Sequence, residues 1–381
     1  MKAVVWHGDE DISVDDVDDP RIEEPTDVLV RITSTAICGS DLHLYGGKVP
    51  GMKDGDIIGH EPMGIVEEVG RDVSHVQKGD RVVVPFNISC GTCFMCERDL
   101  FSQCEATQNH DFKKGASLFG YTHMYGGVPG GQAEYLRVPM GHFGPIKVPH
   151  DDRPDEHYLF MSDVLPTAWQ AVTYADTPED GTLALFGLGP IGLMCVSIAK
   201  HVGVRRVIAL DHVPERLAAG ANRGADVLDV SDVDDIADQL RAMTGGRGPD
   251  CVIDAVGMES EGGFFAQALQ YVKLKPDRHG ALHDSMWSVR RGGTLSIIGV
   301  YGGPDPLFPL GELFDRQIQI RMGQANVWQW IPQILPLLER DDDPLDVGSL
   351  TTHRLPLEQA EHGYEIFRNK EDGAIKVALA P

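Results

Sequence analysis

The segment TLALFGLGPIG, residues 182–192, passes from a continuous apolar run through a glycine-rich turn into a helical pattern. Thr182 to Phe186 has the composition of a buried strand, and apolar residues recur at helical spacing from Ile191 to Val202. A second apolar strand follows at Arg206 to Leu210. Apolar strands that alternate with helices indicate a parallel sheet covered by helices on both faces.

The remainder of the chain extends this pattern on one side and departs from it on the other. After residue 192 the sequence predicts helices and buried strands at Pro214 to Arg223, Val233 to Met243, Cys251 to Ala255 and Thr294 to Gly299. Before residue 182, short β-branched runs broken by glycine, proline and aspartate predict an all-β region with strands at Asp27 to Thr35, Gly64 to Val69, Asp80 to Pro85 and Gln132 to Val138.

These two patterns, in a chain of 381 residues, predict two domains. We expect a β-rich domain over residues 1–164 and an α/β domain with a doubly wound parallel sheet over residues 165–323. Residues 324–381 include the apolar run Ala374 to Leu379, and we expect them to return to the first domain as a helix and an edge strand.

Three glycines in the turn match the pattern GxGxxG, which alone is a weak signal in a chain with 43 glycines. Here the pattern follows a buried strand and opens a helix, and Asp211 ends the next strand 19 residues after Gly192. This context predicts a dinucleotide site, in which Gly187 permits the tight turn, Gly189 lets the backbone approach the pyrophosphate and Gly192 lets helix and strand pack closely. The expected cofactor-binding residues of this region are Gly187, Gly189, Pro190, Ile191, Gly192 and Asp211.

The carboxylate of Asp211 favours NAD over NADP. We expect it to accept hydrogen bonds from the adenosine ribose hydroxyls, and its charge would repel a 2′-phosphate. Arg205, Arg206 and Arg216 stand near the same strand, so an NADP preference stays open as the alternative.

The charge balance argues against several classes of partner. The chain has 33 Lys and Arg against 58 Asp and Glu, and this net charge of −25 repels phosphate backbones and anionic lipid surfaces. We therefore expect neither nucleic acid nor membrane as a partner, and we find no secretory signal or membrane-spanning run in the sequence. Four of the seven cysteines lie within residues 90–104, which suits metal binding in a reducing cytoplasm.

Cys90, Cys93, Cys96 and Cys104 stand close enough in sequence to surround one metal ion. Four thiolates without a histidine or carboxylate close a tetrahedral site and leave no position for a substrate, so the cluster predicts a structural zinc. An iron–sulfur cluster and free thiols are the alternatives. Bacterial ferredoxin spacing has three residues before its last cysteine and proline after it, whereas seven residues and Glu105 stand here.

A second group of metal-ligand residues has too few strong ligands to close a tetrahedral site. Cys38 lies in AICGSDLH, and His60 with Glu61 lies in GHEPMG. A thiolate and an imidazole bind zinc, and a third, weaker ligand would leave a position for water or an alcohol. Zinc there would favour loss of the alcohol proton, so that a hydride can leave for the nicotinamide. The sequence thus predicts one zinc for folding and one for catalysis.

With these motifs, the chain resembles the zinc-dependent medium-chain dehydrogenases, the alcohol dehydrogenase superfamily, over essentially its whole length. The shared motifs are CGSDLH at 38–43, GHE at 59–61, the four-cysteine cluster, GQAEY at 131–135 and GxGxxG. Within the superfamily, VPFN at 84–87, GGQAEY at 130–135 and SDVLPT at 162–167 resemble the glutathione-independent formaldehyde dehydrogenase and dismutase branch. The resemblance implies a GroES-like catalytic domain and a Rossmann NAD-binding domain.

The resemblance also implies the third ligand of the catalytic zinc. That ligand is Asp163, where many relatives have cysteine, so the expected set is Cys38, His60 and Asp163. Glu61 is either an exchanging ligand or a carboxylate that supports the ligands from outside, and Asp41 is expected to orient the His60 ring.

Further site residues follow from the resemblance alone. Ser40 and His43 match a relay in which the alcohol proton passes to a serine hydroxyl and then, through the cofactor ribose, to a histidine at the surface. The implied cofactor contacts are Thr167 at the nicotinamide, Arg216 near the adenosine ribose, Arg368 at the pyrophosphate, and Val300. Phe86 and Trp169 are candidate walls of the substrate pocket.

The expected activity is zinc-dependent hydride transfer between a small alcohol or hydrated aldehyde and NAD, and the branch resemblance suggests formaldehyde. A polyol or threonine dehydrogenase of the same superfamily is the first alternative. A non-catalytic NAD-binding sensor or scaffold is the second, although such a protein has no need to keep both zinc ligands and relay residues. The family implies a homodimer or homotetramer, and Gly257 to Gly292 is similar in place to an insertion that traps the cofactor in that branch.

Overall fold

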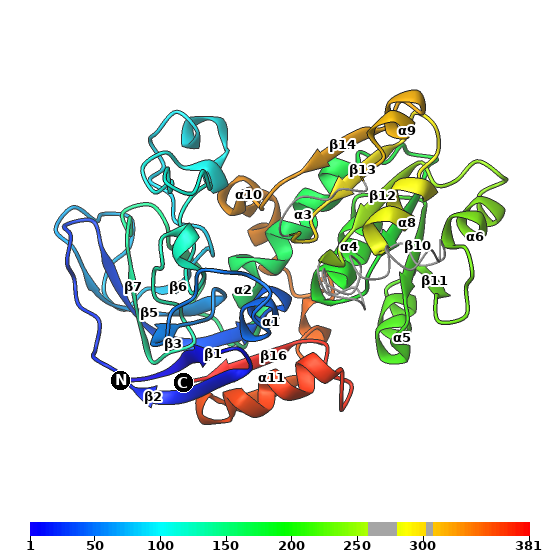
Figure 1. Cartoon of the computed structure of the whole chain (residues 1–381). Helices are drawn as coiled ribbons and strands as arrows, with labels where there is room; N and C mark the ends of the chain where they lie inside the picture. The colour runs from blue at the N-terminus through cyan, green and yellow to red at the C-terminus, as the bar shows by residue number, and fades with distance from the viewer. Residues whose placement is uncertain (258–279, 302–307) are drawn as a thin grey trace. The chain divides into compact units, whose positions relative to one another are not determined.

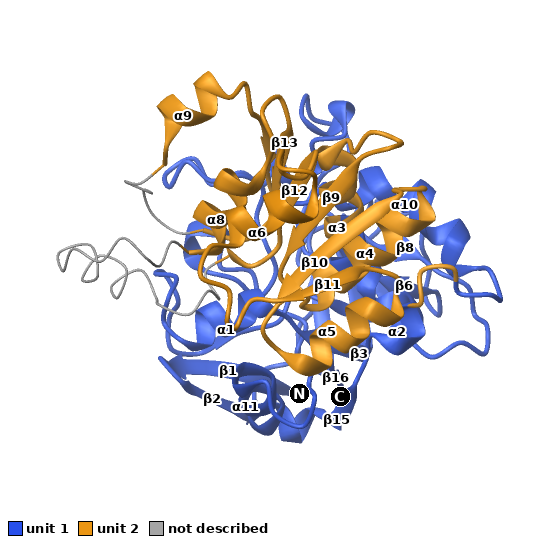
Figure 2. Ribbon diagram, turned by 90° about the vertical axis from the view of Figure 1, so that its right-hand side faces the viewer, with its two compact units in different colours: residues 1–166, 325–343, 347–381 blue, residues 167–324, 344–346 orange. Residues whose placement is uncertain are grey.

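The computed structural model describes residues 1–257, 280–301 and 308–381. The chain divides into two compact units (Figure 2). Unit 1 comprises residues 1–166, 325–343 and 347–381, and unit 2 comprises residues 167–324 and 344–346. The expected cofactor-trapping insertion within Gly257 to Gly292 lies largely outside the described residues.

Unit 1 is built mainly on antiparallel strands. Its larger sheet has the order β15-β16-β3-β5-β6-β8, and β7 pairs with the part of β3 that β16 does not reach. These strands are β3 (Val28–Ile37), β5 (Pro62–Val69), β6 (Arg81–Val83), β7 (Tyr135–Val138), β8 (Ile146–Lys147), β15 (His353–Pro356) and β16 (Val377–Ala380). A smaller sheet has the order β2-β1-β4, formed by β1 (Lys2–Gly8), β2 (Asp11–Asp16) and β4 (Asp56–Ile57).

Helices and short 3₁₀ turns complete unit 1 (Figure 1). The helices are α1 (Gly39–Tyr45), α2 (Glu156–Leu159), α10 (Val327–Leu338) and α11 (Ala360–Asn369), and α3 (Val164–Ala175) begins in unit 1 and continues into unit 2. The 3₁₀ turns are η1 (Cys96–Arg98), η2 (Phe101–Gln103), η3 (His123–Tyr125), η4 (Phe160–Ser162), η6 (Val347–Ser349) and η7 (Leu357–Gln359). Fully buried valines of β3, β5 and β6, together with Phe119 and Leu136, form a hydrophobic core for this unit.

Unit 2 contains a parallel sheet of the order β11-β10-β9-β12-β13-β14. Its strands are β9 (Thr182–Phe186), β10 (Arg206–Asp211), β11 (Asp226–Asp229), β12 (Cys251–Asp254), β13 (Thr294–Ile297) and β14 (Gln319–Met322). Its helices are α4 (Pro190–His201), α5 (Pro214–Asn222), α6 (Ile236–Met243), α8 (Ala281–Ser288) and α9 (Leu310–Asp315). The strand order reverses between β9 and β12, and right-handed crossovers therefore put the helices of the two halves on opposite faces.

The structure confirms the expected fold class, with a β-rich unit and a doubly wound parallel sheet. Two expectations need correction. The helix predicted from Val233 begins at Ile236, because the Asp235 side chain caps it by accepting a hydrogen bond from the Asp238 N–H at 2.7 Å. The run predicted as an edge strand is β16, which lies inside its sheet between β15 and β3; β15, with the sequence HRLP, is too short and polar to be recognised as its neighbour.

The antiparallel pairing of β3 and β5 generates a stability prediction. A Cβ on Gly64 of β5 would lie 2.0 Å from the Arg31 backbone oxygen of β3, so Gly64→Ala must push two paired strands apart. We expect this variant to lower the free energy of unfolding by about 2–3 kcal/mol, measured by urea denaturation. Gly8→Ala is the matched control, because no atom in the described parts of the chain lies within 4 Å of its Cβ position. Equal stability of the two variants would contradict the packing described here.

Candidate functional site

Four potential metal ligands meet in unit 1. Cys38 follows β3, His60 and Glu61 precede β5, and Asp163 lies between η4 and α3. One ligand atom from each of them lies within 4.8 Å of all the others, and all four residues are buried. Asp163 Oδ2 lies 3.5 Å from Cys38 Sγ and 3.6 Å from His60 Nε2. The structure thus brings the three expected zinc ligands together with Glu61.

Asp41 holds this group in place through hydrogen bonds to two of its members. Its Oδ1 atom forms the expected hydrogen bond with His60 Nδ1 at 2.9 Å, which turns Nε2 toward Asp163. Its Oδ2 atom accepts hydrogen bonds from the Cys38 N–H at 2.9 Å and from Gln132 Nε2 at 3.3 Å. Gln132 is in turn fixed by the Tyr364 hydroxyl, which donates to its Oε1 at 2.9 Å. A fully buried carboxylate with three donors therefore orients one ligand and anchors the backbone of another.

Lys376 is a residue of this site that the sequence analysis did not identify. Its Nζ atom lies 2.5 Å from Glu61 Oε1 and donates to the Ile37 backbone oxygen at 3.0 Å, and both Lys376 and Glu61 are fully buried. Burial would lower the pKa of Lys376, but the Glu61 carboxylate raises it above its usual value. The only sequence signal is a single lysine within the apolar run Ala374 to Leu379.

The residues of this group fit a zinc ion. Glu61 belongs to the same group as a thiol, an imidazole and a second carboxylate, and its buried Oε2 atom has no hydrogen-bond partner in the described part of the chain. Burial and the neighbouring Glu61 and Asp163 carboxylates raise the pKa of the Cys38 thiol to about 11. A divalent cation compensates such a set of donors and favours the thiolate form.

Ser40 and His43 both lie on α1, three residues apart. Ser40 Oγ lies 3.5 Å from Cys38 Sγ, so it borders the metal-ligand group. His43 is 4% exposed, and neither of its ring nitrogens has a hydrogen-bond partner among the described residues. Burial, and then the Lys48 charge, lower the pKa of His43 to about 4. The expectation of a histidine at the surface is therefore wrong. It failed because the position of a residue along a helix does not show which side of that helix is covered by the rest of the protein.

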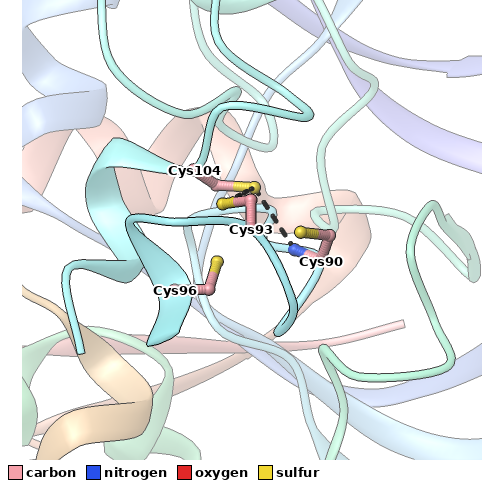
Figure 3. A group of neighbouring side chains, drawn as sticks. All are labelled: Cys90, Cys93, Cys96 and Cys104. Atoms are coloured by element: carbon pink, nitrogen blue, oxygen red, sulfur yellow. Dashed lines mark hydrogen bonds between the residues drawn. The ribbon is translucent and has the colours of Figure 1, made fainter. Parts of the chain in front are cut away.

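The four-cysteine cluster lies on the loop that carries η1 and η2, and Figure 3 shows its side chains converging. The four Sγ atoms all lie within 4.8 Å of one another. Backbone N–H groups of Cys90, Thr92 and Glu105 donate to cysteine sulfurs at 3.3–3.5 Å, which favours thiolates. No histidine or carboxylate joins this group among the described residues. Its donor set fits the closed tetrahedral site expected for a structural zinc.

The glycine-rich turn of unit 2 has the backbone geometry that the motif requires. Gly187 has a φ of +89°, and a Cβ on Gly192 would lie 1.9 Å from the Gly187 backbone oxygen. No atom of the described residues lies within 4 Å of the Gly189 Cβ position, and α4 begins directly after Gly189 with Pro190 and Ile191. A close strand–helix junction with open space at a helix N-terminus suits a pyrophosphate.

Asp211 has structural contacts that the sequence did not indicate. Its Oδ2 atom accepts a hydrogen bond from the Leu188 N–H of the glycine-rich turn at 2.7 Å. Its Oδ1 atom accepts from the backbone N–H groups of His212 and Val213 at 2.7 and 3.0 Å. The carboxylate at the end of β10 therefore holds the turn after β9, in addition to the ribose contact that we predict for it.

The other residues implied as cofactor contacts are distributed over both units. Thr167, Arg216 and Val300 belong to unit 2, where Arg216 is buried and Val300 is 41% exposed. Arg368 belongs to unit 1, where it forms an ion pair with Glu10 and lies over the Tyr45 ring. The two residues expected to line the substrate pocket also belong to different units. Phe86 packs edge-on to His60 in unit 1, and Trp169 contacts His201 in unit 2.

No helix of the described residues is long and apolar enough to cross a membrane.

Comparisons with known proteins agree with the two potential metal sites in this chain. Residues 24–149 match the alcohol dehydrogenase GroES-like domain family, and residues 190–275 match the zinc-binding dehydrogenase family. The chain is 43% identical over 383 residues to an uncharacterized zinc-type alcohol dehydrogenase-like protein of Bacillus subtilis, with 100% of both chains covered. It is 31% identical to the formaldehyde dismutase of Pseudomonas putida, over 96% of this chain and 94% of the relative. The solved alcohol dehydrogenase TADH from Thermus sp. ATN1 is 36% identical with a TM-score of 0.83, over 100% of this chain and 99% of that one.

The two matched families and the coverage of these relatives define the class of protein as a zinc-binding dehydrogenase. The chain belongs to the zinc-dependent medium-chain dehydrogenases, the alcohol dehydrogenase superfamily, and is an oxidoreductase of that kind. The resemblance expected from the motifs is thereby confirmed.

The buried pair of Glu61 and Lys376 generates a prediction. Lys376→Met leaves a buried carboxylate without its cation, and we expect a loss of about 3–5 kcal/mol in the free energy of unfolding. The double variant Glu61→Gln with Lys376→Met should recover part of this loss, because no unpaired charge remains. Chemical denaturation at a fixed zinc concentration measures both.

Lys2→Met is the control for this measurement. Lys2 pairs with Glu358 at 2.6 Å on the surface, where the two side chains are 46% and 54% exposed. An exposed ion pair contributes less than about 1 kcal/mol. A double variant no more stable than Lys376→Met alone would show that the unpaired charge is not the cause.

Proposed function

We propose that this protein transfers a hydride reversibly between NAD and a small primary alcohol or hydrated aldehyde, with formaldehyde as a candidate substrate. The observation that carries the proposal is the buried group of Cys38, His60, Glu61 and Asp163, whose ligand atoms lie within 4.8 Å of one another. A thiol, an imidazole and carboxylates are the donors that zinc takes at catalytic sites, where one position stays open for a substrate. The 31% identity to a formaldehyde dismutase supports a small substrate.

The contacts of the site support a role for each proposed catalytic residue. A zinc ion held by Cys38, His60 and Asp163 would supply the Lewis acidity that favours loss of the alcohol proton. Ser40 is the proposed first acceptor of that proton, at its Oγ atom. His43 is proposed to pass the proton onward: neither ring nitrogen is engaged by another described residue, and because its pKa is lowered to about 4 it would release a proton at pH 7 rather than keep it.

Glu61 is proposed to act beside the ligands rather than as a permanent member of the set. Glu61 belongs to the metal-ligand group; its Oε1 atom is held by Lys376 at 2.5 Å, while its Oε2 atom has no hydrogen-bond partner among the residues that the structure describes. One oxygen that is fixed and one that is unsatisfied support an exchanging carboxylate, which could enter the coordination sphere when a substrate leaves.

Two zinc ions per chain and NAD complete the proposal. Cys90, Cys93, Cys96 and Cys104 would hold the structural zinc, and Cys38, His60 and Asp163 the catalytic one. The proposed cofactor site comprises the glycine-rich turn, Asp211, Thr167, Arg216, Val300 and Arg368. The negative charge of Asp211 at the end of β10 supports NAD, because it would repel the additional phosphate of NADP. A cytoplasmic location is also proposed, since none of the seven cysteines, all of which the structure describes, forms a disulfide.

A substrate panel with zinc analysis tests this function. We expect about two zinc ions per chain and turnover of short alcohols or formaldehyde with NAD that exceeds turnover with NADP. Cys38→Ser should remove one zinc and lower kcat by at least about a hundredfold, because a bound metal supplies several kcal/mol of transition-state stabilisation. Cys195→Ser is the control, since Cys195 is buried in unit 2 outside both ligand groups.

Three outcomes would contradict the proposal. Faster turnover of sorbitol or threonine would point to the polyol or threonine dehydrogenases, and a clear preference for NADP would overturn the cofactor assignment. Binding of NAD with no turnover of any alcohol or aldehyde would point to a sensor or scaffold.

We also propose a homodimer that forms through the edge of the unit 2 sheet. Within the described residues β14 pairs only with β13, so its other edge is open. Three large apolar side chains of this edge strand and of α9, the helix that precedes it, are strongly exposed: Met322 at 58% on β14, and Leu310 at 70% and Phe314 at 84% on α9. An open strand edge flanked by exposed apolar groups is self-complementary across a two-fold axis, which supports a second copy of this chain as the partner.

Sedimentation analysis tests this interface. We expect the native chain to sediment as a dimer, or as a tetramer built from such dimers, and Phe314→Glu to weaken the dimer at least about tenfold by burying a charge at the interface. Val202→Glu should leave the assembly unchanged, because Val202 is 52% exposed but lies at the end of α4, away from the open edge. Dissociation by both variants, or by neither, would exclude this edge as the specific contact.

A further inference from the structure

Asp254 is a fully buried carboxylate that has no part in the function proposed above. It is the last residue of β12, and the Tyr301 hydroxyl donates a hydrogen bond to its Oδ2 atom at 2.5 Å. Its Oδ1 atom accepts from the Val256 N–H at 3.0 Å. Its backbone oxygen accepts from the N–H groups of Ile298 and Gly299 at 3.1 and 3.0 Å. One residue therefore ties the loop after β12 to the loop after β13.

The two loops also touch through their backbones. Gly257 has a φ of +64°, and a Cβ there would lie 2.8 Å from the Val300 backbone nitrogen. A Cβ on Gly299 would lie 2.4 Å from the Gly257 nitrogen. Such distances admit only glycine at both positions. The position of Val300, and with it that of Tyr301, is thus set by the end of β12.

This junction lies at the edge of the sheet where ligands of such folds bind. The strand order reverses between β9 and β12, and open α/β sheets bind their ligands at the carboxyl ends of the strands beside such a reversal. Asp254 pairs in register with Phe186, the residue before the glycine-rich turn. The side chains of Val300 and Tyr301 are 41% and 39% exposed, whereas the Asp254 carboxylate is covered.

The two ends of the dinucleotide can be assigned to the two sides of this reversal. The glycine-rich turn after β9 is the proposed pyrophosphate site, and Asp211 at the end of β10 is the proposed ribose contact of the adenosine half. Because β10 and β12 flank β9 on opposite sides, the nicotinamide half must extend over β12 and β13.

We infer that Asp254 and Tyr301 are positioning residues for the nicotinamide half of NAD. Their hydrogen bond holds the backbone of Gly299 and Val300 where the nicotinamide end of the cofactor meets the sheet. Neither side chain needs to touch the cofactor; each acts through the loop that it fixes. The inference rests on the proposed NAD site, and it adds a determinant of affinity for one half of the cofactor.

Tyr301→Phe tests this inference, because it removes one hydroxyl and keeps the ring. The dissociation constants of NADH and of ADP-ribose, which lacks the nicotinamide, are measured by calorimetry with the full-length, zinc-loaded protein. We expect NADH to bind about tenfold more weakly, the equivalent of one hydrogen bond to a charged group, and ADP-ribose affinity to stay within about twofold. Thermal unfolding confirms that the variant is folded.

Tyr158→Phe is the matched control. The Tyr158 hydroxyl donates a hydrogen bond to Asp151 Oδ2 at 2.7 Å in unit 1. The Tyr158→Phe variant therefore also removes a Tyr–Asp hydrogen bond, but outside unit 2. It should leave both affinities unchanged. Unchanged NADH affinity in Tyr301→Phe, or equal weakening of NADH and ADP-ribose, would overturn the inference while the proposed function stands. Failure of the native protein to bind NADH would overturn both.

Discussion

The burial of several acidic side chains in one place is the constraint on which unit 1 depends. Cys38, Asp41, Glu61 and Asp163 are withdrawn from water together, and each ionised group there requires a partner of opposite charge or a set of hydrogen-bond donors. Asp41 has three donors and Glu61 has Lys376 on one oxygen. A zinc ion would compensate the negative charge of the remaining groups, which are the second Glu61 oxygen, Asp163 and the Cys38 thiol. Folding and metal binding in this unit are therefore two aspects of one electrostatic balance.

The same chemistry recurs at the strand ends of unit 2, with backbone amides in place of a metal. Asp211 and Asp254 end β10 and β12, on either side of β9, and each accepts hydrogen bonds from the loop that follows its strand. Each also reaches a neighbouring loop, through Leu188 in one case and Tyr301 in the other. The binding edge of the parallel sheet is thus fixed from both sides by carboxylates. Loops at such an edge need rigid support because they carry the ligand contacts.

Local patterns in the sequence predict most of the fold and much of the site. Strand β9 is predicted to the residue, since an apolar run that ends at the glycine-rich turn has no competing interpretation. The spacing of the four cysteines predicts one ligand group, and the motifs around Cys38 and His60 predict part of the second, whereas Asp163 follows only from the family resemblance. Partners from distant segments could not be predicted: Lys376 is 315 residues from Glu61, and a single lysine in an apolar run does not reveal its counter-ion. The burial of His43 and the pairing of β15 likewise depend on tertiary contacts that no local pattern encodes.

The arrangement of the larger sheet has a consequence for the order in which the chain can fold during synthesis. Most of unit 2 is one continuous stretch, residues 167–324, whereas the part of β3 next to Cys38 pairs with β16, residues 377–380. Domains fold largely as units while the chain leaves the ribosome. Unit 2 is therefore complete before β16 has been made, while β3 still has an open edge and Glu61 still lacks Lys376. Unit 1, although its first residues are translated first, is the later of the two to mature.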